Sequence, residues 1–358
     1  MIFKLTAITI YLMFYSSFSF STNILTRYNQ IVSDDNIQKV ITQFTPNVAA
    51  DFIPLASYSY CTEEMMKSGN CCSSKLSKTY VLEYTDTLKV DNYTYAILRS
   101  DEKKHIVLTF SGTKDPSILI TEIKESNAVK FLNDEYKEMY TTQYFNRIYL
   151  EGRENIKDKL IKLQIKYPDY QYIFTGHSLG GAMATLFSLD SVLRGLIKKT
   201  DSSPVLITYA SPRVGNYILA ASVMYYVPIV FRIVNEGDPV TLLPPCSFIF
   251  GAFGACRNLN TLIFSQEKFQ EKTASDKKFW HTGGLILYSK EMTSYINCGK
   301  LYSENNPDSD CLYGLAFSKD RHSIYLNRPV GKLCKTDPKK LFIETRKDFL
   351  KTKRLLNK

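Results

Sequence analysis

Histidine, tryptophan and long apolar segments are scarce in this sequence of 358 residues, which has four histidines and one tryptophan. Beyond the N-terminal segment, no stretch stays apolar for the roughly 18 residues that a membrane-spanning helix needs, so we expect the rest of the chain to be soluble. The sequence also lacks internal repeats and any linker rich in proline, glycine and serine. These absences favour one large domain, and any histidine-dependent chemistry must use one of four side chains.

Both ends of the sequence differ in composition from the part between them. Residues 1–4 are a short basic start, residues 5–20 are apolar, and small serines lie near the end of that run. This order is typical of a signal peptide over residues 1–21, although a single membrane anchor would look similar. Residues 335–358 carry nine Lys or Arg and three acids, within a net charge of +10. This basic tail is either solvated or an amphipathic helix with weak affinity for anionic membranes.

The cysteines suit an oxidising compartment. There are eight of them, and an even number behind a signal peptide indicates disulfides. Cys71 and Cys72 are neighbours, but no histidine lies near them, so a zinc site is not expected. Cys246 and Cys256 lie close to each other in the sequence, which favours a disulfide between these two.

The most informative motif is the pentapeptide G-H-S-L-G at residues 176–180. Residues 170–174 before it are mostly aromatic or β-branched, as in a strand, and residues 179–196 contain no proline, as in a helix. A serine on a sharp strand-to-helix turn holds its hydroxyl clear of the sheet, above helix N–H groups that can stabilise an oxyanion. We therefore predict that Ser178 is a nucleophile; the alternative is an ordinary glycine-rich turn.

The remaining groups of an acyl-transfer site should follow in the order acid, then histidine. Asp238 lies in a turn after the strand-like residues 230–234, where α/β sites are built, although it could simply begin an Asp-Pro turn. One histidine precedes Ser178 and another adjoins it. That leaves His281 and His322, and spacing alone does not choose between them.

A second oxyanion donor should come from a loop after an early strand. Residues 106–110 are a continuous apolar run that ends in S-G-T at residues 111–113. We predict that Thr113 supplies its backbone N–H, and its hydroxyl as well, beside the N–H of Leu179. The alternative is a simple glycine turn.

Strand-like runs alternate with helical ones along the chain, which indicates a mostly parallel central sheet covered on both faces. Five motifs occur in a specific order: F-S-G-T at 110–113, T-G-H-S-L-G-G-A at 175–182, S-P-R-V-G-N at 211–216, V-N-E-G-D-P-V at 234–240 and D-R-H-S-I-Y at 320–325. In this order the chain resembles the fungal-type, or class 3, triacylglycerol lipases. The resemblance implies an α/β-hydrolase fold over residues 22–334, with a lid segment over the active site.

The resemblance also implies roles for single residues. By it, Ser178 is the nucleophile, Asp238 orients the imidazole and His322 is the general base, whereas His281 packs beneath the site. It further implies disulfides Cys61–Cys334 and Cys298–Cys311, which leaves Cys71–Cys72 as a vicinal pair by subtraction.

Three departures from the family pattern bear on substrate preference and on the behaviour of the lid. Ser111 stands where the family usually has arginine, residues 143–146 lack the family's histidine and glycine, and residues 115–126 lack the tryptophan often seen in the lid. Residues 115–126 are therefore either a lid or a plain surface helix. Residues 246–256 are either a wall for the acyl chain or a core loop closed by a disulfide.

Together these observations predict a secreted carboxylic-ester hydrolase, foremost a triacylglycerol lipase. A phospholipase A1, a polysaccharide-acyl esterase and an inactive lipid-binding protein are the alternatives. The resemblance implies a lipid ester at an oil–water or membrane interface as the substrate. The proposed chemistry needs no metal or organic cofactor, and no base-reading motif suggests a nucleic-acid partner.

Overall fold

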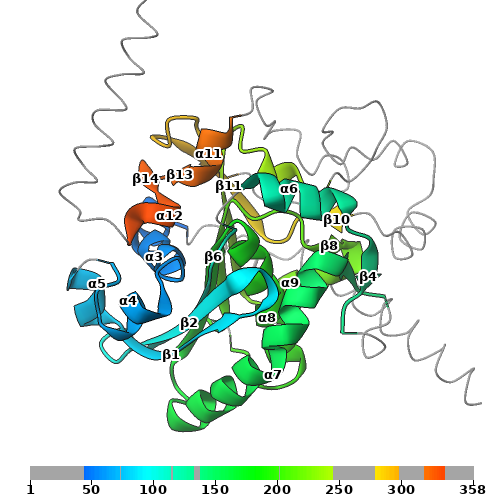
Figure 1. Ribbon diagram of the computed structural model, residues 1–358. Coiled ribbons are helices and arrows are strands. Elements are labelled where there is room, and N and C mark those ends of the chain that lie inside the picture. The colour runs from blue at the N-terminus through cyan, green and yellow to red at the C-terminus, as the bar shows by residue number, and fades with distance from the viewer. Residues whose placement is uncertain are drawn as a thin grey trace, which may run out of the picture.

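The protein is built around a twisted sheet with helices on both faces (Figure 1). The computed structural model describes residues 44–72, 74–113, 116–132, 138–200, 202–244, 279–297 and 318–334. Eight strands form the central sheet in the order β1-β2-β3-β6-β7-β9-β11-β12. They are β1 (Val81–Leu88), β2 (Tyr93–Ser100), β3 (His105–Phe110), β6 (Gln171–His177), β7 (Val205–Tyr209), β9 (Ile229–Asn235), β11 (Gly284–Tyr288) and β12 (Tyr295–Asn297).

The middle of this sheet is parallel and its edges are antiparallel. Strands β3, β6, β7, β9 and β11 pair in parallel register, whereas β1 and β2 form an antiparallel ribbon beside β3, and β12 pairs antiparallel with β11. Every residue of β7 is buried, as expected for a strand covered on both faces. The predicted α/β-hydrolase architecture is confirmed.

The two faces of the sheet carry separate apolar cores, because alternate side chains of a strand point to opposite sides. On β3, Leu108 packs with one cluster and Val107 with the other. Helices α7 (Gln143–Lys166), α8 (Leu179–Leu193) and α9 (Tyr217–Tyr226) contribute to the cluster of Leu108, and α3 (Pro46–Tyr58) contributes to the cluster of Val107.

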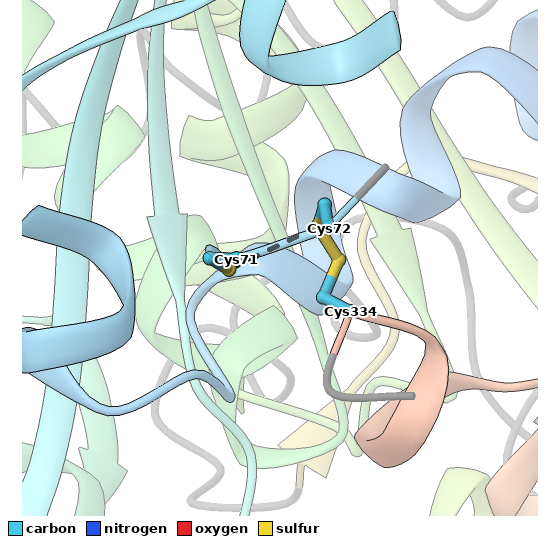
Figure 2. A group of neighbouring side chains, drawn as sticks. All are labelled: Cys71, Cys72 and Cys334. Atoms are coloured by element: carbon cyan, nitrogen blue, oxygen red, sulfur yellow. Dashed lines mark hydrogen bonds between the residues drawn. A yellow bond between two sulfur atoms is a disulfide. The ribbon is translucent and has the colours of Figure 1, made fainter. Parts of the chain in front are cut away.

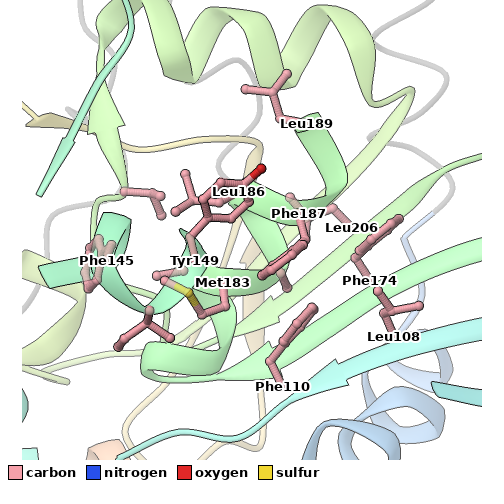
Figure 3. Packing of buried hydrophobic residues seen from close by; sticks show 14 of the residues in the cluster. Leu108, Phe110, Phe145, Tyr149, Phe174, Met183, Leu186, Phe187, Leu189 and Leu206 are labelled. Carbon is pink, nitrogen blue, oxygen red and sulfur yellow. The ribbon is translucent and has the colours of Figure 1, made fainter. Parts of the chain in front are cut away.

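The larger core holds the elements around the end of β3 in place (Figure 3). The rings of Phe110 and Phe187 are stacked with their centroids 5.0 Å apart, and the ring of Tyr149 lies 4.8 Å from Phe187. This packing joins β3 to α8 and α7. Gly152 of α7 faces the same cluster, where an added Cβ would lie 3.0 Å from a methyl group of Leu88.

Smaller elements complete the described parts of the chain. A second sheet has the strand order β10-β8-β5-β4, and β13 and β14 form a separate antiparallel pair. These elements are α4 (Glu63–Lys67), α5 (Ser74–Thr79), η1 (Val90–Asn92), α6 (Pro116–Glu125), β4 (Ala128–Lys130), β5 (Tyr140–Thr142), β8 (Gly215–Asn216), η2 (Val240–Leu242), β10 (Phe279–Trp280), α11 (Lys319–Ser323), β13 (Ile324–Tyr325), β14 (Arg328–Pro329) and α12 (Val330–Leu333).

Helix α7 begins earlier than its apolar spacing indicates. Apolar residues at 156, 160, 163 and 165 predict a helix over residues 151–166, but α7 starts at Gln143. The reason is a cap: the Thr142 hydroxyl accepts a hydrogen bond from the backbone N–H of Phe145 over 3.0 Å, which satisfies one of the free donors at a helix start. The first two turns thereby bring Tyr144 and Arg147 beside α6.

Several predictions concern parts of the chain outside the described residues. They are the signal peptide over 1–21, the apolar loop 246–256, the pairs Cys246–Cys256 and Cys298–Cys311, and the basic tail 335–358. Within the described ranges, none of the helices combines the length and apolar character that crossing a bilayer requires.

One disulfide closes a short loop in the N-terminal region, a second joins that region to the residue after α12, and together they correct two predicted pairs. Cys61 bonds to Cys71 and Cys72 bonds to Cys334, so the pairs Cys61–Cys334 and Cys71–Cys72 are wrong. The hairpin containing α4 brings the Cα atoms of Cys61 and Cys71 to 6.0 Å. The backbone N–H of Cys72 donates to the carbonyl of Cys334 over 2.9 Å, which sets these two residues side by side (Figure 2). Among the described cysteines none is free.

Candidate active site

Ser178 lies on a sharp turn between β6 and α8. Its φ of 61° and ψ of −127° are outside the regions that L-residues ordinarily adopt, at a cost of about 1–3 kcal/mol. The turn depends on two glycines. A Cβ on Gly176 would lie 2.3 Å from the backbone of Gly180, and a Cβ on Gly180 would lie 2.1 Å from the carbonyl oxygen of Phe110. The predicted strand–turn–helix context of Ser178 is therefore present.

Ser178, His322 and Asp238 are connected in one buried chain of hydrogen bonds. Ser178 Oγ lies 2.8 Å from Nε2 of His322, and Nδ1 of His322 lies 3.0 Å from both carboxylate oxygens of Asp238. A carboxylate only accepts, so Nδ1 carries the proton and Nε2 accepts from the serine hydroxyl. The three residues are at most 1% exposed. This arrangement allows His322 to remove the Ser178 proton as the hydroxyl attacks an acyl carbon.

The elements around Asp238 hold its carboxylate in a fixed orientation. Asp238 follows β9, and its Oδ1 accepts a hydrogen bond from the backbone N–H of Val240 over 3.0 Å. Its Oδ2 accepts from the hydroxyl of Tyr325 over 2.7 Å. Tyr325 is fully buried and lies on β13, directly after the helix that carries His322. The acid therefore receives three donors, two from side chains and one from the backbone.

His281 has a different environment from His322. It lies between β10 and β11 and is buried. Burial is the main cause that lowers the pKa of His281 well below its usual value, and the cations of Arg232 and Arg213 add to this shift. The structure thus brings His322 to Ser178 and Asp238, and it places His281 in a buried, cationic environment.

Of the two predicted oxyanion donors, Leu179 directly follows Ser178 and Thr113 lies in the loop after β3. Leu179 is the first residue of α8, where a backbone N–H has no partner within the helix. Thr113 follows the end of β3, and the close approach of Gly180 to Phe110 keeps that loop against the elbow. The Thr113 side chain faces the hydroxyl of Tyr144 at the start of α7.

The predicted lid segment forms helix α6 next to this loop. Leu119 and Ile123 are buried in the larger core, whereas Ile118 is 52% exposed. Glu122 faces Arg147 of α7 across 3.9 Å. A pair of that length between exposed side chains contributes little to stability. The helix therefore has one packed stripe and one isolated apolar side chain directed to solvent.

Sequence reasoning missed two tyrosines at this site, Tyr325 and Tyr60. Tyr325 was inside the quoted D-R-H-S-I-Y motif, but nothing in the motif assigns its hydroxyl to the acid. Tyr60 lies just before Cys61 and donates to His177, which is 117 residues away. No local pattern predicts a contact at such a separation.

The parallel sheet with a serine elbow after β6, an acid after β9 and a histidine near the end of the domain defines an α/β-hydrolase. Solved structures agree with this fold. One is a triacylglycerol lipase described as having a serine protease triad as its catalytic centre. It aligns with a TM-score of 0.63 and 22% identity, over 80% of this chain and 96% of its own.

Residues 107–248 match the family model for lipase (class 3). A lipase of Caenorhabditis elegans is 34% identical over 150 residues, which are 42% of this chain and 41% of the worm protein. A lipase of Rhizomucor miehei is 27% identical over 233 residues, 62% of this chain and 60% of the fungal one. Residues 107–248 thus resemble the class 3 lipases, and the matched stretches span less than two thirds of these relatives' own length.

Proposed function

We propose that this protein is a carboxylic-ester hydrolase that cleaves lipid esters, with triacylglycerols as the foremost substrates. The observation that carries the proposal is the buried chain from Ser178 Oγ through His322 to Asp238. Such a chain activates a serine that is otherwise a weak nucleophile at neutral pH. The match of residues 107–248 to the class 3 lipase family model supports a fatty-acid ester as the substrate.

In the proposed reaction, Ser178 Oγ attacks the ester carbonyl while Nε2 of His322 takes the hydroxyl proton. Asp238 keeps the imidazole in the required tautomer and stabilises its charged form. The backbone N–H groups of Thr113 and Leu179 stabilise the oxyanion. His322 then gives the proton to the leaving alcohol, and an acyl-enzyme remains. A water molecule that His322 deprotonates attacks the acyl carbon, the fatty acid leaves, and Ser178 regains its proton.

The proposed place of action is outside the cell, at a lipid–water interface. The two disulfides are suited to an oxidising compartment, and the relatives include secreted mono- and diacylglycerol lipases of fungi. Helix α6 presents Ile118 to solvent beside the loop of Thr113, so the proposed lipid contact is made there.

Labelling with a fluorophosphonate probe tests the proposal at its first step. The wild-type protein should become labelled on Ser178, and the Ser178→Ala variant should not. Hydrolysis should fall on the order of 10⁶-fold in that variant, as when a serine hydrolase loses its nucleophile. Retention of activity within tenfold of wild type would end the assignment. Parallel assays on triacylglycerol, phospholipid and acetylated polysaccharide then separate a lipase from a phospholipase A1 and an acyl-polysaccharide esterase.

A further inference from the structure

The side chain of His177 bridges a tyrosine and the backbone of His322. Its Nδ1 lies 2.7 Å from the hydroxyl of Tyr60, and its Nε2 lies 2.7 Å from the carbonyl oxygen of His322. His177 is the residue before Ser178, at the end of β6. It is 4% exposed, and its ring centroid lies 4.8 Å from that of His322. The residue beside the nucleophile therefore contacts the backbone of the base.

The chemistry of these three groups sets the direction of both hydrogen bonds. A carbonyl oxygen only accepts, so Nε2 of His177 must carry a proton and donate it to His322. Burial, and then the nearby His322, lower the pKa of His177 to about 3, so its ring is neutral and has a single N–H. Nδ1 is then an acceptor, and the Tyr60 hydroxyl donates to it. The bonds run in one direction, from Tyr60 to the backbone of His322.

Tyr60 also contacts the loop that carries Thr113, the proposed oxyanion donor. The Tyr60 hydroxyl lies against Gly112, the residue before Thr113: burial raises the pKa of this hydroxyl, and the Gly112 backbone opposes the rise. A Cβ on Gly112 would lie 2.0 Å from the Tyr60 hydroxyl and 2.7 Å from the carbonyl oxygen of His177. Only glycine at position 112 leaves room for the Tyr60 hydroxyl that contacts His177. The side chains of Tyr60 and His177 thus connect the Thr113 loop, the turn of Ser178 and the backbone of His322.

We propose that Tyr60 and His177 are positioning residues. Their directed hydrogen bonds hold the His322 backbone, and the packing of Tyr60 against Gly112 holds the Thr113 loop, at a fixed distance from Ser178. The inference rests on the proposed function. Its physical basis is that His322 stands on a helix of only five residues, which gives its backbone little support of its own. The bond from His177 supplies a fixed point beside the 2.8 Å contact between Nε2 of His322 and Ser178. A displacement of about 1 Å in such a contact can cost about 100-fold in rate.

The chain offers a matched control for Tyr60. Tyr80 also places its hydroxyl against a histidine Nδ1, that of His105, at 3.0 Å. His105 begins β3, at the strand end opposite the Thr113 loop. Tyr60→Phe and Tyr80→Phe therefore each remove one tyrosine hydroxyl from a histidine. We expect Tyr60→Phe to lower kcat about tenfold with KM within about twofold of wild type, since the bond supports only the reacting geometry. Tyr80→Phe should leave both constants unchanged.

Substitutions of His177 test the second bond. A glutamine amide can donate to the His322 carbonyl and accept from Tyr60 at once, whereas leucine can do neither. His177→Gln should stay within about fivefold of wild-type kcat, the rate equivalent of about 1 kcal/mol. His177→Leu should lose about 100-fold.

Proton NMR gives a readout that does not require turnover. The Nδ1–H proton of His322, held by Asp238, should shift or broaden in Tyr60→Phe and in His177→Leu, and stay at its wild-type position in Tyr80→Phe. An unchanged resonance in Tyr60→Phe and His177→Leu would overturn the proposal, and Tyr60→Phe does so alone if His177→Leu does not fold. If the resonance shifts as expected while the fluorophosphonate fails to label wild-type Ser178, the positioning role is kept and the proposed hydrolase function is rejected.

Discussion

Tyr325 donates its hydroxyl hydrogen to Asp238 over 2.7 Å, and the same oxygen accepts the backbone N–H of Asn235 over 3.0 Å. One buried hydroxyl thus joins the residues after His322 to the end of β9. Because a buried donor or acceptor left without a partner is costly, this hydroxyl contributes both to the orientation of the acid and to the stability of the segment that carries the base.

Replacing Tyr325 with phenylalanine should affect both properties. The variant leaves the Asn235 N–H unpaired, which should lower the free energy of unfolding by about 1–3 kcal/mol. It should also lower kcat about tenfold, which corresponds to about 1.4 kcal/mol of lost transition-state stabilisation. Urea unfolding and steady-state kinetics measure the two effects. Tyr209→Phe is the control, because the Tyr209 hydroxyl bonds to the Ala49 carbonyl and not to the acid; an equal loss of kcat in both variants would contradict the assignment.

The two candidate histidines should differ in what their removal changes. His322→Ala should lower kcat by several orders of magnitude, comparable with Ser178→Ala, while the melting temperature changes little. Adding Ser178→Ala to it should cause no further loss, because residues that act as one unit are not additive. His281→Ala should instead lower the melting temperature and reduce activity only in part. A stable but inactive His281→Ala protein beside an active His322→Ala protein would reverse the two roles.

His177 should make the protein less stable in mild acid. Its pKa falls from 6.5 to about 3 on folding, so between these values the unfolded chain binds more protons than the folded one. The free energy of unfolding therefore decreases as pH falls through this window, by up to about 1.4 kcal/mol per pH unit. His177→Gln does not titrate and should show a shallower decrease between about pH 6.5 and about pH 4 in urea unfolding. Identical slopes for the two proteins would show that His177 is not held neutral.

Helix α6 should contribute to activity on lipid surfaces but not on dissolved esters. Ile118 is 52% exposed on α6, whereas Ile165 is 77% exposed at the far end of α7. Ile118→Asp places a charge where the proposed lipid contact is made, and should lower the rate on a long-chain triacylglycerol emulsion about tenfold, for a loss of about 1.4 kcal/mol. Its rate on a short soluble ester should stay unchanged. Ile165→Asp should affect neither rate; an equal effect of both variants on the emulsion would rule out a specific role for α6.

Peptide mapping under non-reducing conditions should identify the disulfides. Cleavage between Cys71 and Cys72 separates the two observed bonds, which join Cys61 to Cys71 and Cys72 to Cys334. The fragment with Cys334 should then carry Cys72. Recovery of Cys61 with Cys334 would contradict the structure. Cys72→Ser and Cys334→Ser should lower the melting temperature to a similar extent, because each removes the same crosslink between segments 262 residues apart.

The parts of the site that depend on neighbouring residues could be predicted from the sequence. The elbow of Ser178 is a strand, a glycine-flanked turn and a helix in direct succession, and each part has its own local signal. Asp238 could be predicted in the same way, because it lies in a turn directly after a buried strand. The run of β-branched, leucine and aromatic residues at 205–209 predicts a strand with the bounds that β7 has, because such a buried run specifies both the type of the element and its ends.

The sequence by itself determined the nucleophile turn, the sheet and the list of candidate acids and bases. Only the tertiary structure decided which groups meet. His322 lies 144 residues from Ser178 along the chain. From the sequence, only a family resemblance favours His322 over His281 as the histidine beside Ser178, whereas the structure shows the contact directly. The bonds of Tyr60 and Tyr325, and the cysteine pairing, depend in the same way on how distant segments pack. Contacts of this kind follow from the global arrangement of the core, which short-range patterns do not encode.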